Sequence, residues 1–230
     1  MGDVEQLKSE YSSKKDKIKA RLLQFEKFLK YPYSWHYIEN DLKLVPSDKS
    51  DDNRIFEELA FCIFTANTSA EMGAKAVDSV RSVLMNGTAD EMTKKLEGVY
   101  RFINLRPAYI VHTRDHFNNS FNFKLKDKIN SFKNMHERRD YFVENVKGLG
   151  MKEASHFLRN IGFKGYAILD KHIINSLHEF GVIETNNKPK NAKEYLEIEK
   201  KLIDFSKQIG IDVDELDLLL WSKKNGRILK

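Results

Sequence analysis

The chain has 230 residues, of which 41% are hydrophobic, and its formal net charge is +5 at pH 7. This length is sufficient for one large or two small domains with a core of ordinary size. The single cysteine, Cys62, excludes an internal disulfide and any zinc or iron–sulfur site made of cysteines alone. No apolar run approaches the eighteen residues of a membrane span, so we expect no membrane partner. This excess of positive charge suits a protein that binds nucleic acid, but it is common in proteins that never bind it.

Long three- and four-residue periodicities, with only four prolines and eleven glycines, predict an all-α fold. Residues 3–30 read as a charged amphipathic helix that ends before Pro32, because proline cannot continue it. An aromatic patch that follows is expected to pack this arm onto the body: Trp35, Tyr37 and Ile38. After a polar, loop-like stretch, a second unit begins. We therefore divide the chain into an N-terminal helical arm, residues 1–53, and a core, residues 54–230.

Apolar residues at helical spacing predict the remaining helices. A buried helix runs from Ile55 and stops at residues 65–69, and a second one covers residues 70–85. Later helices are expected near Pro107, from Met151, after Asp170, over residues 192–208 and over residues 211–223. Residues 115–141 are polar, which is typical of short helices around loops. Four basic residues there are candidates for a phosphate backbone, or else for a solvated surface: Lys133, His136, Arg138 and Arg139.

The most informative stretch is a predicted glycine hairpin that opens a helix, residues 143–162. Gly148 and Gly150 lie one residue apart, where the chain must turn sharply and leave its backbone uncovered. From Met151 onward, apolar residues at spacings of three and four share one helix face. A helix start that follows bare glycine amides presents unpaired N–H groups and the positive end of the dipole. We therefore expect an anion site, and in a basic protein the obvious anion is a nucleic-acid phosphate.

Two residues in this region can carry chemistry. Lys152 lies in the first turn of the new helix, where desolvation and the helix dipole favour the free amine that acts as a nucleophile. Asp170 follows just before an apolar run, where it can cap the next helix. Together they suit covalent attack at a sugar carbon that bears positive charge. The alternatives are a solvated surface lysine and an aspartate that only caps.

These residues carry a family resemblance. Residues 146–154 read Val-Lys-Gly-Leu-Gly-Met-Lys-Glu-Ala, and residues 168–173 read Ile-Leu-Asp-Lys-His-Ile. The chain resembles the helix-hairpin-helix base-excision glycosylases, in which a lysine at the place of Lys152 marks the members that also cleave the strand. It is most similar to the archaeal 8-oxoguanine DNA glycosylases with AP lyase activity. The similarity includes the C-terminal stretch, with Trp221 and the final Lys230.

The resemblance implies two helical subdomains with the active-site cleft between them, and it implies roles for single residues. The side chain of Asn67 would fill the gap left by an extruded base, or it merely caps a helix. Phe102 would stack on the damaged base, or it is one more core phenylalanine. Trp221 and Lys230 would help to hold the base, or they are a half-buried aromatic residue and a frayed end. His172, two residues after Asp170, is a candidate phosphate contact.

We expect a DNA repair enzyme that removes 8-oxoguanine from duplex DNA and cleaves the abasic site by β-elimination through a lysine Schiff base. It is expected to be a monomer in the cytoplasm, at the nucleoid of a prokaryote, and the resemblance favours an archaeal one. No histidine has the spacing of a metal ligand, so we predict no metal site and no cofactor beyond a monovalent cation that the resemblance implies at the hairpin. The alternatives are a related glycosylase for oxidised pyrimidines or mismatched bases, and a non-catalytic DNA-binding module.

Overall fold

A computed structural model describes residues 2–223, 226–228 and 230, and these fold into eleven helices and one β-hairpin. The first part comprises α1 (Val4–Lys30), β1 (Tyr33–Ile38), β2 (Asp41–Pro46), α2 (Asp51–Thr65), α3 (Ala70–Val80), α4 (Ala89–Leu96) and α5 (Arg106–Phe121). It is followed by α6 (Leu125–Asn130), α7 (Met135–Asn145), α8 (Met151–Asn160), α9 (Lys171–Glu179), α10 (Ala192–Ile209) and α11 (Val213–Ser222). Within the described part, no helix combines the length and the apolar character needed to cross a membrane.

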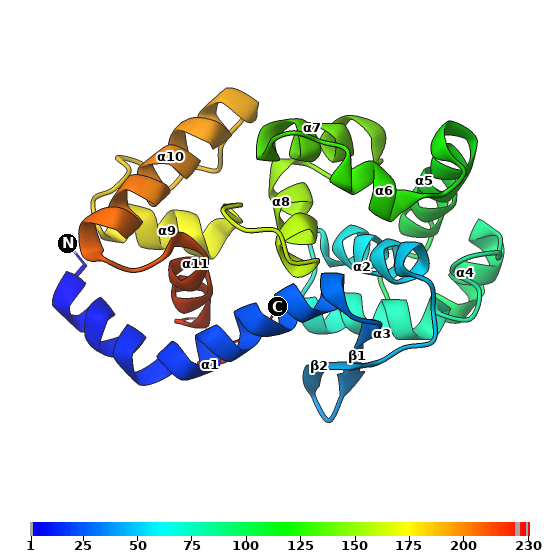
Figure 1. Cartoon of the computed structure of the whole chain (residues 1–230), viewed down its shortest axis with the longest axis horizontal. Helices are drawn as coiled ribbons and strands as arrows, with labels where there is room; N and C mark the ends of the chain where they lie inside the picture. Colours follow the sequence, from blue (N-terminus) through cyan, green and yellow to red (C-terminus); the bar gives the residue numbers. More distant parts are fainter. Residues whose placement is uncertain (1, 224–225, 229) are drawn as a thin grey trace.

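The helices form two groups, with α8 between them. Figure 1 shows α2 to α7 on one side and α9 to α11 on the other, while the long α1 runs below α9 and α11 and ends near the middle of the molecule. Helix α1 packs on α11 of the second group, on α8 and on β1 of the hairpin. The predicted all-α fold with two helical subdomains is therefore confirmed.

Helix α1 covers the stretch for which the sequence predicts a helix. Asp3 caps its start, because its side chain accepts hydrogen bonds from two amides of the first turn. Leu7, Ile18 and Phe25 are buried and join one hydrophobic core that extends through both groups. The arm is therefore part of the core, and the division of the chain at residue 53 stays a prediction.

The β-hairpin corrects the prediction for the segment after α1. Strands β1 and β2 pair antiparallel, with Tyr33 opposite Pro46 and Ile38 opposite Asp41. Glu39 and Asn40 form its turn with positive φ angles of 53° and 60°. The sequence of β1 does alternate, since Tyr33, Trp35 and Tyr37 are separated by Ser34 and His36, and this period of two was a usable signal for the strand.

Helix boundaries differ from the predicted ones at two further places. Helix α2 begins at Asp51, inside the stretch that reads as a loop, because the Ser50 side chain accepts from the Asn53 amide and caps it. Helix α3 ends at Val80, five residues earlier than predicted, and continues as turns. Both differences arise where a polar cap or a turn overrides hydrophobic spacing.

Two members of the predicted basic cluster are structural. Arg139 is fully buried in α7 and pairs with Glu199 of α10 at 2.7 Å. The guanidinium of Arg138 donates to the carbonyls of Ile129 and Phe132. The prediction that this cluster meets a phosphate backbone is therefore wrong for both arginines, because their donors hold neighbouring helices together.

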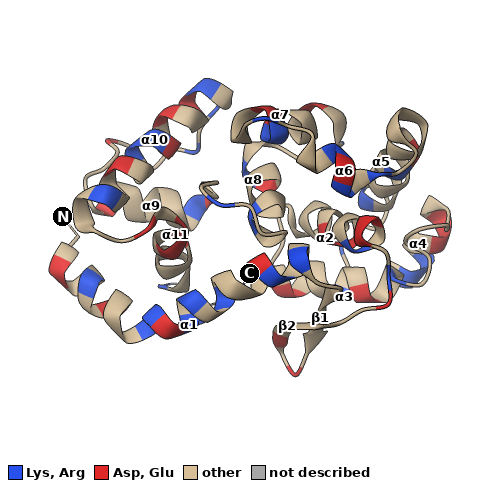
Figure 2. Ribbon diagram, in the orientation of Figure 1, with Lys and Arg blue, Asp and Glu red and all other residues tan. Residues whose placement is uncertain are grey.

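The excess positive charge does not mark a binding face by itself. Figure 2 shows Lys and Arg interspersed with Asp and Glu along α1 and along α10. Local ion pairs occur on both helices, such as Lys8 with Glu5 at 3.1 Å on α1 and Lys207 with Asp204 at 3.9 Å on α10. The site must therefore be located from its geometry and chemistry rather than from net charge.

Candidate active site

The glycine hairpin lies between α7 and α8, as the sequence predicts. Gly148 has a φ of +86°, and a Cβ atom there would lie 2.7 Å from the ring of Tyr109. Gly150 differs from the prediction, since its φ of −98° is accessible to any residue and a Cβ atom would meet nothing closer than 3.5 Å. Gly150 is the N-cap of α8 and gives the helix no side-chain cap. The start of α8 therefore has the bare amides of an anion site.

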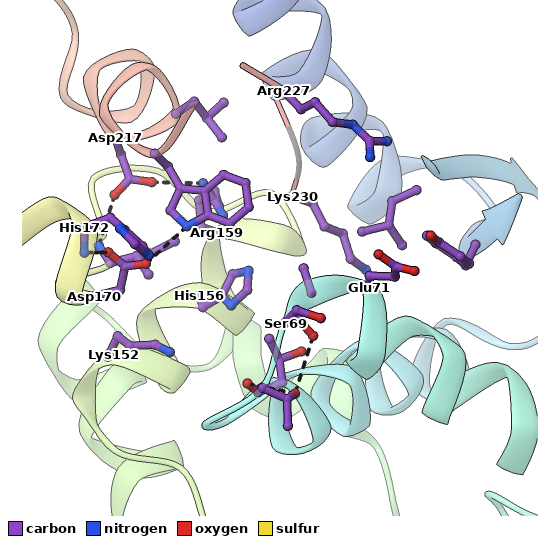
Figure 3. Close-up of a pocket in the computed structure, with 18 of the residues that line it drawn as sticks. Ser69, Glu71, Lys152, His156, Arg159, Asp170, His172, Asp217, Arg227 and Lys230 are labelled. Atoms are coloured by element: carbon purple, nitrogen blue, oxygen red, sulfur yellow. Dashed lines mark hydrogen bonds and ion pairs between the residues drawn. The ribbon is translucent and has the colours of Figure 1, made fainter. Parts of the chain in front are cut away.

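A cavity of about 260 Å³ opens between the two helical groups, close to the lower end of small-ligand pockets at roughly 300 Å³. Its walls come from α8, α9, α11, the turn between α2 and α3, the β-hairpin and the end of the chain. The predicted site residues that line it are Lys152, Asp170, His172, Trp221 and Lys230. Figure 3 shows Lys152 and Asp170 on one side of this cavity and Lys230 on the other. The predicted cleft between the subdomains is thus present.

Asp170 is held in a fixed orientation by three N–H donors. Its Oδ1 accepts from the amides of His172 at 2.7 Å and Ile173 at 2.9 Å, so it caps α9 as predicted. Its Oδ2 accepts from the indole Nε1 of Trp221 at 3.1 Å. The carboxylate is therefore presented to the cavity between two helices, and Trp221 is part of its support.

Lys152 lies in the first turn of α8, and its side chain is 29% exposed. Its amine lies 3.1 Å from a carboxylate oxygen of Glu153. One turn further along α8, His156 also lines the cavity. Burial, reinforced by the charge of Arg159, holds the pKa of His156 well below its usual value, so its imidazole is neutral at pH 7.

A buried ion pair forms the wall next to Asp170. Asp217 of α11 lies 3.1 Å from the guanidinium of Arg159, and both residues line the cavity. Burial raises the pKa of Asp217 to about 7, although the charge of Arg159 opposes that shift. Sequence reasoning missed both residues, but Asp217 comes one helical turn before Trp221, and this spacing was a usable signal.

Lys230 is fixed at the opposite wall. Its amine pairs with Glu58 of α2 and lies over the ring of Phe61, 3.9 Å from the ring centroid. Asn160 donates to the other oxygen of Glu58 at 2.7 Å. The alternative reading of Lys230 as a frayed end is therefore wrong. Glu58 was not singled out because its partner lies 172 positions away in the sequence.

Apart from the hairpin residues Gly148 and Gly150, two predicted site residues do not line the cavity. Asn67, with a φ of 62°, lies in the turn between α2 and α3, and its carbonyl accepts from Arg101. It does not cap α3, because Ser69 does. Phe102 requires a correction, since it is packed between Arg101 and Arg106 rather than in the cavity wall. Trp221 is the aromatic residue that lines the cavity beside Asp170.

The hairpin at the start of α8, with a lysine and a capping aspartate at one cavity between two helical groups, is the arrangement that the resemblance to the helix-hairpin-helix DNA glycosylases implies. The family model described as 8-oxoguanine DNA glycosylase matches residues 40–211. The chain belongs to this family, which confirms the resemblance.

Similar proteins agree with this assignment. A relative named 8-oxoguanine DNA glycosylase/AP lyase from Korarchaeum cryptofilum is 39% identical over 84% of this chain and 90% of its own. The protein of the same name from Methanocaldococcus jannaschii is 36% identical over 99% of this chain and 97% of its own. The crystal structure of the M. jannaschii enzyme in complex with a 15mer DNA containing 8-oxoguanine superimposes with a TM-score of 0.82, at 33% identity and 99% coverage of both chains. These relatives give no support to the two alternative functions.

Proposed function

We propose that this protein excises 8-oxoguanine from duplex DNA and then cleaves the strand at the abasic site, with Lys152 as the nucleophile. The observation that carries this proposal is that Lys152 and Asp170 line one cavity. Lys152 lies in the first turn of α8, directly after the hairpin with its bare amides. The names of the relatives add the substrate and both activities.

Binding begins at the hairpin. The amides at the start of α8 would hold a backbone phosphate beside the lesion, with His172 as a second phosphate contact. A monovalent cation on the hairpin carbonyls would strengthen this grip. The damaged nucleotide is then extruded from the stack, at a cost of roughly a few kcal/mol, and the amide of Asn67 fills the gap.

Chemistry follows at the sugar. As the glycosidic bond breaks, positive charge develops on C1′, and the Asp170 carboxylate stabilises it. The amine of Lys152 forms a bond to C1′ as the base departs with the electrons of the glycosidic bond. One amine proton passes to the base and the other to O4′ as the sugar ring opens, which leaves a Schiff base. Removal of a C2′ proton then expels the 3′-phosphate and nicks the strand. All these steps use groups that belong to the chain and to the DNA.

Recognition of the base would use the remaining walls of the cavity. Trp221 offers a flat apolar face beside Asp170, and Lys230 supplies a polar group at the far wall. We further propose that the protein acts as a monomer, because Lys152, Asp170 and the hairpin come from a single chain. Since its substrate is chromosomal DNA, its place of action would be the nucleoid in the cytoplasm of a prokaryote.

The test is borohydride trapping on a duplex that contains one 8-oxoguanine. We expect a covalent adduct with the wild type, none on an undamaged duplex, and none with Lys152→Gln. A matched control is Lys164→Gln, because Lys164 is an exposed lysine paired with Glu26 outside the cavity. DNA binding without any adduct in the wild type would overturn the assignment of lyase activity, and an adduct that survives in Lys152→Gln would overturn the assignment of the nucleophile.

A further inference from the structure

The segment that leads into Asp170 is held by side chains from distant helices. Residues 166–169 are buried and belong to neither a helix nor a strand, so their amides need partners from outside the segment. Three consecutive amides obtain them: Ala167 donates to Glu199, Ile168 to Asp217 and Leu169 to the hydroxyl of Tyr195. The backbone that carries Asp170 is thus positioned from α10 and α11.

Of these three partners, Tyr195 of α10 binds the amide next to Asp170 in the sequence, that of Leu169. Its hydroxyl accepts from the Leu169 amide at 3.3 Å and donates to the Ala167 carbonyl at 2.6 Å. Burial raises the pKa of this phenol above its usual value, so the hydroxyl stays protonated and can donate a hydrogen bond. One side chain therefore satisfies both a donor and an acceptor of the segment.

The same cluster reaches the helix that carries Lys152. The Tyr195 hydroxyl lies 3.4 Å from the hydroxyl oxygen of Ser155 on α8, three residues after Lys152. Arg139 of α7 donates to that Ser155 oxygen at 3.2 Å and pairs with both carboxylate oxygens of Glu199. All four side chains, Arg139, Ser155, Tyr195 and Glu199, are buried. They connect the helix of Lys152 to the segment of Asp170, yet none of them lines the cavity.

We propose that Tyr195 and Glu199 are positioning residues that set the placement of Asp170 relative to Lys152. This inference rests on the proposed function of that lysine and aspartate. Without the Tyr195 hydroxyl, the Leu169 amide and the Ala167 carbonyl lose their partners in a buried site, and the segment shifts to find others. Because a misplacement of about 1 Å can cost about 100-fold in rate, a small shift is sufficient to slow excision.

The test compares Tyr195→Phe with the wild type in single-turnover excision of 8-oxoguanine at saturating enzyme. The rate per active site is expected to fall about 10- to 100-fold, while the Kd for DNA stays unchanged. Borohydride trapping at long times counts the active sites, which separates slower chemistry from loss of folded protein. The control is Phe205→Leu, a buried position on α10 that packs on Phe180 away from the segment.

A second variant covers the case in which Tyr195→Phe does not fold. Ser155→Ala removes one hydroxyl from the cluster with little change in volume, and we expect a smaller loss of rate in the same direction. A rate per active site equal to that of the wild type in the folded variants would overturn the proposal, and so would an equal loss in Phe205→Leu. Failure of the proposed function is distinguishable, because the wild type itself would then show no excision.

Discussion

The cavity has a lysine on each of two opposite walls, and their surroundings differ. The side chain of Lys152 is 29% exposed, on a helix that begins with bare amides. The side chain of Lys230 is only 1% exposed, pairs with Glu58, and is covered by the rings of Phe61 and Trp35. Both amines contact a carboxylate, but the pair of Lys152 with Glu153 is partly exposed and open to the cavity, whereas the pair of Lys230 with Glu58 is buried. The proposed roles of the two lysines, as nucleophile and as recognition group, therefore rest on their environments rather than on residue type.

The largest effect is expected at the wall of Lys152, from Asp170→Asn. Asparagine keeps an oxygen that can cap α9, but it has no charge to stabilise the sugar cation. We expect the excision rate to fall about 10²- to 10⁴-fold with DNA affinity nearly unchanged, and the melting temperature to fall modestly because the new amide nitrogen cannot accept from the indole N–H of Trp221. Single-turnover kinetics and a binding titration check this prediction. A loss of less than about tenfold would mean that Asp170 serves only as a cap.

A substitution at the wall of Lys230 is expected to lower the free energy of unfolding. Glu58→Gln leaves the buried ammonium of Lys230 without a carboxylate, which costs about 3–5 kcal/mol when one partner of a buried pair is removed. Urea denaturation measures the change in the free energy of unfolding. The control is Glu5→Gln, which breaks the exposed pair with Lys8 and should cost less than about 1 kcal/mol. Similar losses in both variants would remove the distinction between the two lysines.

The smallest expected effect is a change in how the free energy of unfolding depends on pH, through Asp217. Its pKa is raised by burial from an ordinary value of 3.8 to about 7, so between these values the folded state binds more protons than the unfolded state. This group therefore contributes stability at low pH that is lost as the pH rises through about 7. As the pH rises from 5 to 8, the free energy of unfolding of Asp217→Asn should therefore fall less than that of the wild type. Urea denaturation at several pH values gives the slope, and equal slopes would contradict the prediction.

The sequence alone was sufficient for the hairpin, for α8 and for the cap of α9, because each depends on neighbours within a few residues. Gly148 needs a positive φ, and Asp170 precedes the helix that it caps. The apolar face of α8 is buried as its spacing predicts. The catalytic roles of Lys152 and Asp170 come from the resemblance and stay proposals.

The rest could not be read from the sequence, because it depends on residues that only the fold brings together. Glu58 meets Lys230, and Arg139 meets Glu199 across 60 positions, without a motif that marks either pair. The β-hairpin is different, because the alternation within its strands was a usable signal. Phe102 was singled out by resemblance, but packing between two arginines keeps it out of the cavity wall.

The central claim is that Lys152 and not Lys230 forms the covalent bond to DNA. The most direct measurement is peptide mapping by mass spectrometry of the wild-type protein trapped with borohydride on an 8-oxoguanine duplex. The mass of the sugar remnant is expected on the peptide that contains Lys152, and the peptide that contains Lys230 should be unmodified. A remnant on Lys230, or on any lysine outside the cavity, would contradict the account.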